Sequence, residues 1–475
     1  MSVEPIRRQS LISFVWKISL TFIGFLSTMY FAHTVGAGIL GVYFLFTAYF
    51  GVINLFSDGG LGGAAIKRIS EGKEQNAYFS AFFVLRSLFL ITVILCLLTL
   101  KGHFTDLNDE DIFNWLLIAL AVSLFYGPLN NALAGLAKVG IRETCCFINE
   151  IARIFTQVIA VFFGYGIAGL AGGFVIGMIV ATIIELRFFD LRLTPFKWRH
   201  VKNLSSFSFW LFLTSSGVML YSYADTIMIG YYLSNSDIGI YRVAVQFTSI
   251  AALATTSMQV TLWPRISRWG KTGEIRLVES SLSEAIKYAL LIAMPICIGG
   301  VVVGDKLLYY FYGDEFVQGY PVLVILCMTQ IISVFQLFFL AYLSALDMQK
   351  KAFKVTSIAA TLNIVMNAIL IPLVGIVGAA IATLTTIGIN GILARKMLAT
   401  TIQIKFEYST FFNILKASLL MGMIVGVYRL IIPLSNVWLA IIAVFIGGMV
   451  YGILLLKFDD RVYGEIERIF NQFIQ

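Results

Sequence analysis

The sequence predicts an all-α integral membrane protein with 14 transmembrane helices, built as two six-helix lobes followed by two C-terminal helices. The first observation is composition: 59% of the 475 residues are hydrophobic and only 13% are charged, whereas a soluble chain carries about 25% charged residues. The second is a mean hydropathy of +0.88. The third is a series of long apolar stretches separated by short basic loops. A soluble fold could not cover its surface with so few charges.

The apolar stretches define the predicted helices. A transmembrane helix needs about 20 mostly apolar residues, because the hydrocarbon core of a bilayer is about 30 Å thick. The first stretch is too long for the core of a signal peptide, so we expect it to be retained as the first span. The predicted spans are 11–33, 36–57, 79–100, 112–136, 146–164, 167–187, 206–231, 237–262, 283–303, 320–346, 353–372, 375–395, 410–432 and 436–457.

The distribution of Lys and Arg predicts the orientation in the membrane. Placing the N-terminus in the cytoplasm puts almost all basic loop residues on the inner side, and leaves Lys101, Lys306 and Arg429 on the outer side. This asymmetry follows the positive-inside rule. We therefore expect a multi-pass protein of the cell membrane with both termini cytoplasmic. The net charge of +8 lies in these short loops, so we exclude nucleic acid as a partner.

Two glycine motifs recur in the second half of the chain. Gly41-Val-Tyr corresponds to Gly239-Ile-Tyr, and Gly166-Ile-Ala-Gly corresponds to Gly375-Ile-Val-Gly. Their order and near-equal spacing indicate a repeat of six helices in parallel orientation, an arrangement that builds transporters with a central cavity. The alternative is that small residues recur because membrane helices pack closely through them.

The repeat and the basic segment between its halves predict the domain boundaries. The predicted parts are an N-lobe at 1–190, a basic cytoplasmic linker at 191–205, a C-lobe at 206–397, and the last two helices with a cytoplasmic tail at 398–475.

Cysteine and histidine do not predict a metal site. The five cysteines form no CxxC pair, and the three histidines are scattered along the chain. We interpret the cysteines as free thiols and expect neither a metal nor another cofactor.

Several motifs resemble those of the polysaccharide transporters of the multidrug/oligosaccharidyl-lipid/polysaccharide exporter superfamily, which include the O-antigen flippases. Asp225-Thr-Ile-Met-Ile-Gly and Ser236-Asp-Ile-Gly-Ile-Tyr-Arg-Val-Ala resemble their seventh and eighth helices. The segment 363–383 resembles their eleventh and twelfth, and Asp58-Gly-Gly-Leu-Gly-Gly resembles the turn after their second. The resemblance extends over nearly the whole chain.

This resemblance implies a flippase rather than an enzyme. The expected substrate is an oligosaccharide on a polyprenyl-type phosphate or pyrophosphate, moved to the outer face by alternating access for surface glycan assembly. Coupling to an H+ or Na+ gradient is implied, and the partners are membrane lipids and polysaccharide-assembly enzymes. The alternatives are an ion-coupled small-molecule or multidrug antiporter of the same superfamily, and an enzyme acting on polyprenyl-linked sugars. The outer loops are short for an enzyme.

Cations inside the membrane are the candidate head-group ligands, since an anionic head group in a low-dielectric cavity needs a charged partner. These are Lys17, Arg86, Arg153 and Arg242. For Lys17 and Arg86 the alternative is that the side chain reaches back to the inner surface. For Arg153 it is an ion pair with Glu150, three residues earlier on the same helix face.

Three carboxylates and three tyrosines complete the predicted site. Asp225 and Arg242 lie at similar depth in adjacent helices, as either a structural ion pair or a transport pair. Glu150 is a further candidate for coupling, and Asp58 is expected to contact Lys67 or Arg68. Tyr221, Tyr223 and Tyr241 are candidate sugar contacts; the alternative is an interfacial aromatic belt.

Overall fold

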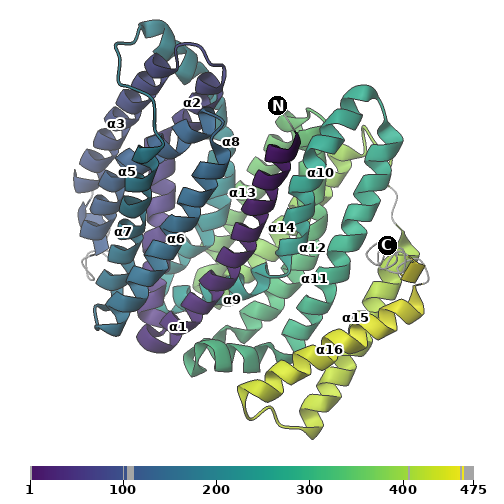
Figure 1. Cartoon of the computed structure of the whole chain (residues 1–475). Helices are drawn as coiled ribbons and strands as arrows, with labels where there is room; N and C mark the ends of the chain where they lie inside the picture. The colour runs from purple at the N-terminus through teal and green to yellow at the C-terminus, as the bar shows by residue number, and fades with distance from the viewer. Residues whose placement is uncertain (1–2, 100, 104–111, 405–406, 460–462, 465–475) are drawn as a thin grey trace. The chain divides into compact units, whose positions relative to one another are not determined.

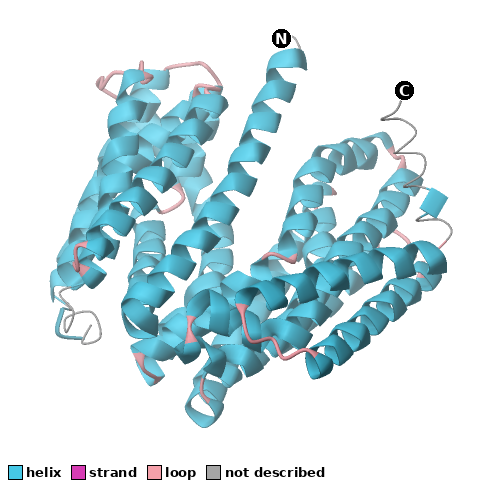
Figure 2. Ribbon diagram, turned by 60° about the horizontal axis from the view of Figure 1, so that its bottom comes forward, coloured by secondary structure: helices cyan, strands magenta, loops and turns pink. Residues whose placement is uncertain are grey.

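The computed structural model describes residues 3–99, 101–103, 112–404, 407–459 and 463–464, which are helical almost throughout and contain no strand. Figure 2 shows these helices joined by short loops. The described residues divide into two compact units, Met1–Gly239 and Ile240–Gln475. The all-α prediction is confirmed.

The first unit consists of the purple to blue-green helices of Figure 1. Its helix α6 packs along α7, α5 packs on α7, and α2 lies between α5 and α8. Its elements are α1 (Val3–Asp58), α2 (Leu61–Ser70), α3 (Gln75–Thr99), η1 (Lys101–His103), α5 (Ile112–Gly135), α6 (Val139–Phe162), α7 (Gly166–Arg187), α8 (Trp198–Tyr232) and the first residues of α9 (Asn235–Ser249).

The second unit is centred on α12, which packs against α11 and α14. Helix α13 packs on α14, and α15 packs on both α11 and α16. Its remaining elements are α10 (Ala252–Thr272), α11 (Ile275–Tyr312), η2 (Asp314–Gly319), α12 (Tyr320–Ala345), α13 (Gln349–Val374), α14 (Ile376–Leu398), α15 (Tyr408–Ile431) and α16 (Val437–Phe458).

Eleven helices of the described residues are long and apolar enough to cross a membrane, or up to 12 if the bent pair α9–α10 forms one span. The difference from the 14 predicted spans has identifiable sources. The predicted spans 11–33 and 36–57 form one continuous helix, α1, with non-helical angles at Gly36. Helix α8 contains the predicted span 206–231, and several side chains of that span lie outside the described residues, so it was not counted. The protein is a multi-pass membrane protein, and the number 14 stays a prediction.

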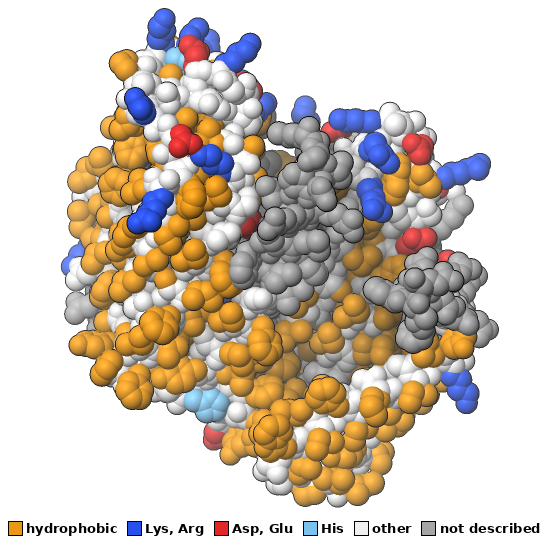
Figure 3. Space-filling model, viewed as in Figure 1, with side chains coloured by type: hydrophobic (Ala, Val, Ile, Leu, Met, Phe, Trp, Pro, Cys, Tyr) orange, Lys and Arg blue, Asp and Glu red, His pale blue; other side chains and the backbone are white. Residues whose placement is uncertain are grey.

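The outer surface of the helices is apolar, as contact with lipid requires. Large hydrophobic side chains of α3 such as Leu88, Ile91 and Leu95 are more than half exposed. Figure 3 shows hydrophobic side chains covering the flank of the first unit, while Lys and Arg gather near its upper end in this view. An exposed apolar surface of this extent is typical of a membrane-facing one.

The repeat motif Gly166/Gly375 forms a similar turn in each unit, with Gly166 as the first residue of α7 and Gly375 directly before α14. Both glycines have positive φ, 47° and 68°, at the turn that begins α7 or α14, and this region favours glycine. One turn later, a Cβ at Gly169 would lie 2.7 Å from the Cβ of Ala160, and a Cβ at Gly378 would lie 2.3 Å from the carbonyl oxygen of Leu370. The second glycine of each motif therefore packs its helix against the preceding one.

The other repeat motif marks a close helix contact. A Cβ at Gly41 would lie 1.8 Å from the carbonyl oxygen of Asn235, and one at Gly239 would lie 2.2 Å from that of Ala37. Helix α1 and the start of α9 approach each other here through their backbones, which any larger residue would prevent.

Candidate functional site

One face of α6 carries polar side chains through the apolar interior of the first unit. We call Arg142, Cys146, Asn149, Arg153 and Gln157 the α6 polar face; they recur every three or four residues and so lie on one side of the helix. Helix α7 presents small residues to it. A Cβ at Gly173 would lie 2.4 Å from Cγ of Gln157, and one at Gly177 would lie 2.6 Å from Oδ1 of Asn149.

The end of this face near α1 contains a hydrogen-bond network that reaches Tyr43 of α1. Gln157 is buried, and its amide donates to the Tyr43 hydroxyl at 2.9 Å and to the Leu170 carbonyl oxygen at 2.7 Å. Arg153 forms the ion pair with Glu150 that their spacing predicts, and it also interacts with the Tyr43 hydroxyl. Both members of the pair remain partly exposed, at 23% and 34%. A substrate contact by Arg153 stays a prediction.

The other end of the α6 polar face is built from residues that sequence reasoning missed. The Asn149 amide donates to the Tyr126 hydroxyl at 3.2 Å. Arg142 Nε donates to Asn130 Oδ1 at 2.8 Å, and Asn130 Nδ2 donates to Glu185 Oε1 at 2.8 Å. The signal that could have found them is the regular polar spacing along α6 and a single Glu near the end of the apolar run 167–187.

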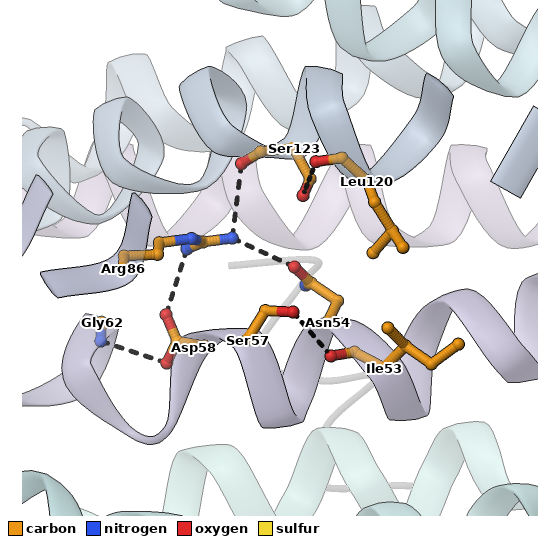
Figure 4. A network of polar contacts seen from close by, with 8 residues as sticks. All are labelled: Ile53, Asn54, Ser57, Asp58, Gly62, Arg86, Leu120 and Ser123. Atoms are coloured by element: carbon orange, nitrogen blue, oxygen red, sulfur yellow. Dashed lines mark hydrogen bonds and ion pairs between the residues drawn. The ribbon is translucent and has the colours of Figure 1, made fainter. Parts of the chain in front are cut away.

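Arg86 lies in a separate buried network, shown in Figure 4. Its guanidinium donates to Asp58 Oδ1 at 3.0 Å, to Asn54 Oδ1 at 3.1 Å and to the Ser123 carbonyl oxygen at 3.3 Å. The side chain is 3% exposed. The other oxygen of Asp58 accepts the backbone N–H of Gly62. This network joins α1, α3 and α5 at the turn into α2, and a role of Arg86 in head-group binding stays a prediction.

The partner of Asp58 therefore differs from the expected one. Arg68 pairs with Glu71 on its own helix, and Lys67 lies over the Phe207 ring, 4.1 Å from its centroid. Helix α2 thus directs Arg68 toward its own C-terminal end and Lys67 toward α8.

The remaining predicted site residues are distributed over both units. Asp225 is buried in α8 of the first unit, and Arg242 is half-buried in the part of α9 that belongs to the second. Their pairing stays a prediction. Tyr221 and Tyr223 are half-buried, and Tyr241 is only 2% exposed. The side chain of Lys17 lies outside the described residues.

The second unit contains buried amides and an apolar cavity. Asn363 Nδ2 donates to Thr386 Oγ1 at 3.4 Å, and Asn367 Nδ2 donates to Asn363 Oδ1 at 3.1 Å, so Asn363 joins α13 to α14. A cavity of about 420 Å³ lies among α11, α12, α14 and α15. Its walls are mostly apolar, and its charged members are Lys287, Arg395 and Glu407.

The described residues contain no group of three or more His, Cys, Asp or Glu side chains placed to hold a metal ion. The five cysteines, all within the described ranges, form no disulfide.

A polar helix face inside an apolar bundle is typical of a transporter, and comparison with known proteins identifies the group. The model of the polysaccharide biosynthesis protein family matches residues 38–321. The chain belongs to this family. The family predicted from the sequence motifs is thereby confirmed.

Relatives within and around the family match along most of the chain. The chain is 28% identical over 452 residues to the probable low-salt glycan biosynthesis flippase Agl15 of Haloferax volcanii, covering 95% of this chain and 96% of the relative. It is 24% identical over 478 residues to the probable flippase AglR of the same organism, covering 99% of each.

Two solved structures share the fold. The lipid II flippase MurJ in an inward closed conformation superposes with a TM-score of 0.79 at 18% identity, covering 94% of this chain and 98% of that one. An inward-facing multidrug resistance transporter of the MATE family superposes with a TM-score of 0.67 at 14% identity, covering 80% and 95%. This polysaccharide biosynthesis protein therefore has the fold of the exporter superfamily.

Proposed function

We propose that this protein is a flippase that moves a lipid-linked oligosaccharide from the cytoplasmic to the outer face of the cell membrane for surface glycan assembly. The carrier is a polyprenyl-type phosphate or pyrophosphate, and the movement is by alternating access. The observation that carries the proposal is the match over the full length of two proteins named as flippases, one of them for glycan biosynthesis. These relatives also support transport rather than enzymatic activity.

The structure of the α6 polar face also supports this function. A charged sugar-bearing head group cannot cross hydrocarbon unaided, because ionised groups cost several kcal/mol there. Arg142 and Arg153 are both partly exposed, at 33% and 23%, so they can contact a phosphate without leaving the unit. Arginine suits phosphate because its fork of N–H donors fits two oxygens at once.

The membrane arrangement follows from the same proposal. It comprises 14 spans with both termini cytoplasmic, two six-helix lobes related by a parallel repeat and two further helices. The similar glycine turns at Gly166 and Gly375 support the repeat. Coupling to an H+ or Na+ gradient would give the movement its direction, and glycan-assembly enzymes would act on the lipid before and after it.

A strain deleted for the gene tests the proposed function. We expect its lipid extract to contain an accumulated lipid-linked oligosaccharide and its surface glycan to be lost, both restored by the wild-type gene. An intact surface glycan with altered sensitivity to drugs would contradict the proposal and favour the small-molecule antiporter, which would also fit the fold shared with a multidrug resistance transporter of the MATE family.

A further inference from the structure

A buried carboxylate lies next to the α6 polar face. Glu185, in the last turns of α7, is 0% exposed. Its Oε1 accepts one hydrogen bond, from the Asn130 amide at 2.8 Å, whereas its Oε2 has no hydrogen-bond partner among the described residues. An ionised carboxylate can accept about four hydrogen bonds. The site therefore satisfies the ionised form poorly.

The groups around Glu185 include a single cation among the described residues. Helix α5 contributes Asn130 and Tyr126, and helix α6 contributes Arg142, Cys145 and Cys146. Asn130 links the carboxylate to Arg142, because it donates to Glu185 Oε1 and accepts from Arg142 Nε at 2.8 Å. These neighbours do not supply a second carboxylate, so Glu185 and Arg142 do not form a site for a metal ion.

The relay through Asn130 connects the buried carboxylate to a solvent-accessible cation. Arg142 is 33% exposed, and within the described part of the chain its other ionic contact is with Glu143, at 3.6 Å. When Glu185 is ionised, part of the charge of Arg142 is balanced through the relay. When Glu185 takes a proton, Arg142 keeps its full charge for an external anion. By linkage, an anion bound at Arg142 must favour the protonated form of Glu185 to the same degree.

We propose that Glu185 is a proton-binding site of this protein, and that proton binding there is coupled through Asn130 to binding of an anionic phosphate head group at Arg142. The second half of this proposal rests on the proposed function. Protonation removes a buried charge that its surroundings satisfy poorly, and intramembrane carboxylates are the groups through which transporters carry protons.

Infrared difference spectroscopy of the full-length protein in lipid nanodiscs tests the proton site without any substrate. Titration with pH should show a carbonyl stretch of a protonated carboxyl group that is lost in Glu185→Gln. The same change at an exposed position, Glu71→Gln, should leave the band intact. A band that survives in Glu185→Gln would overturn the site. Should that variant fail to fold, Arg142→Gln serves instead: its band should persist to higher pH, and an unchanged titration would overturn the coupling.

Binding of geranylgeranyl pyrophosphate to the same nanodiscs tests the linkage. We expect the wild-type Kd to rise with pH, by up to about tenfold per pH unit for one linked proton, relative to Glu185→Gln. The ligand's own phosphates titrate equally in both measurements, so the comparison with that variant cancels their effect on Kd. Equal pH dependence in both proteins would overturn the coupling. No binding to the wild type at any pH would contradict both the coupling and the head group of the proposed function, while the infrared band would still decide the proton site.

Discussion

At the scale of single residues, the ion pair between the buried Arg86 and Asp58, whose side chain is 21% exposed, should contribute strongly to stability. Removing one partner of a buried ion pair leaves an uncompensated charge and costs about 3–5 kcal/mol. We expect Arg86→Met to lower the free energy of unfolding by about this amount, because the guanidinium is 3% exposed and bonds to three residues of α1 and α5. Thermal unfolding of the purified protein in nanodiscs measures it.

The matched control for this change is Arg68→Met. Arg68 pairs with Glu71 at 3.0 Å on the surface of α2, and exposed pairs of this kind contribute about 0–1 kcal/mol. Equal destabilisation by the two variants would show that the Arg86 network is not specially stabilising. A variant Arg86→Met that is stable but no longer supports surface glycan would instead assign the guanidinium to the substrate.

Residue contacts were predictable from the sequence only where they are local. The Glu150–Arg153 pair follows from a spacing of three on one helix, and the structure contains it. Asp58 instead bonds to Arg86, 28 residues away, a contact that depends on how α3 packs beside α1. The chain Arg142–Asn130–Glu185 joins three helices, so no single stretch of sequence reveals it.

At the scale of elements, hydrogen bonds and ion pairs hold the segment between α7 and α8 against neighbouring parts of the first unit. The backbone N–H of Arg192 donates to Asn76 and that of Thr194 to Ser80, both in α3. Lys138 pairs with Asp190. At the start of α8, the backbone N–H of Lys197 donates to His200 Nδ1, so Nε2 carries the hydrogen that bonds Glu74 at 3.2 Å. Arg199 also pairs with Glu74.

These contacts predict that the local stability of this segment depends on pH. The hydrogen bond from His200, together with the charge of Arg199, holds the pKa of Glu74 below its ordinary value of 4.5. A carboxyl with a lowered pKa in the folded state stabilises that state above the ordinary value and loses this contribution as pH falls through the lowered one. We therefore expect faster exchange of the Arg192 and Thr194 amides in Glu74→Gln than in the wild type at neutral pH, with the difference vanishing in acid.

Hydrogen–deuterium exchange, compared at matched intrinsic rates, measures this difference. Glu71→Gln is the control, since Glu71 contacts Arg68 rather than this segment. A difference between Glu74→Gln and wild type that stays constant down to strongly acidic pH would contradict the role given to the Glu74 carboxylate.

Helix positions were predictable, but their polar ends were not. The apolar runs begin at 146 and 206, whereas α6 begins at Val139 and α8 at Trp198. Hydropathy detects the part of a helix that crosses hydrocarbon and misses the turns that extend into water. For this reason the second half of the predicted linker 191–205 is helical, and Arg142 lies in the first turn of α6 rather than in a loop.

At the scale of the whole molecule, composition alone was enough for the fold class. Few charges and long apolar runs leave only helices that satisfy their backbone groups internally. The number of spans was harder to predict, because a helix of 56 residues such as α1 is long enough for two crossings and breaks only at one glycine. The family followed from motifs along the chain, and the match to residues 38–321 confirms it.

The most direct test of the flippase account is reconstitution. Purified protein would be placed in liposomes that contain the lipid-linked oligosaccharide recovered from the deletion strain, and a membrane-impermeant glycosidase would be added outside. The account predicts that nearly all of the oligosaccharide becomes accessible with the wild-type protein, whereas only the outer-leaflet fraction is cleaved in protein-free liposomes. Cleavage limited to the outer leaflet in both, with the protein folded and with a proton gradient of either direction imposed, would contradict it.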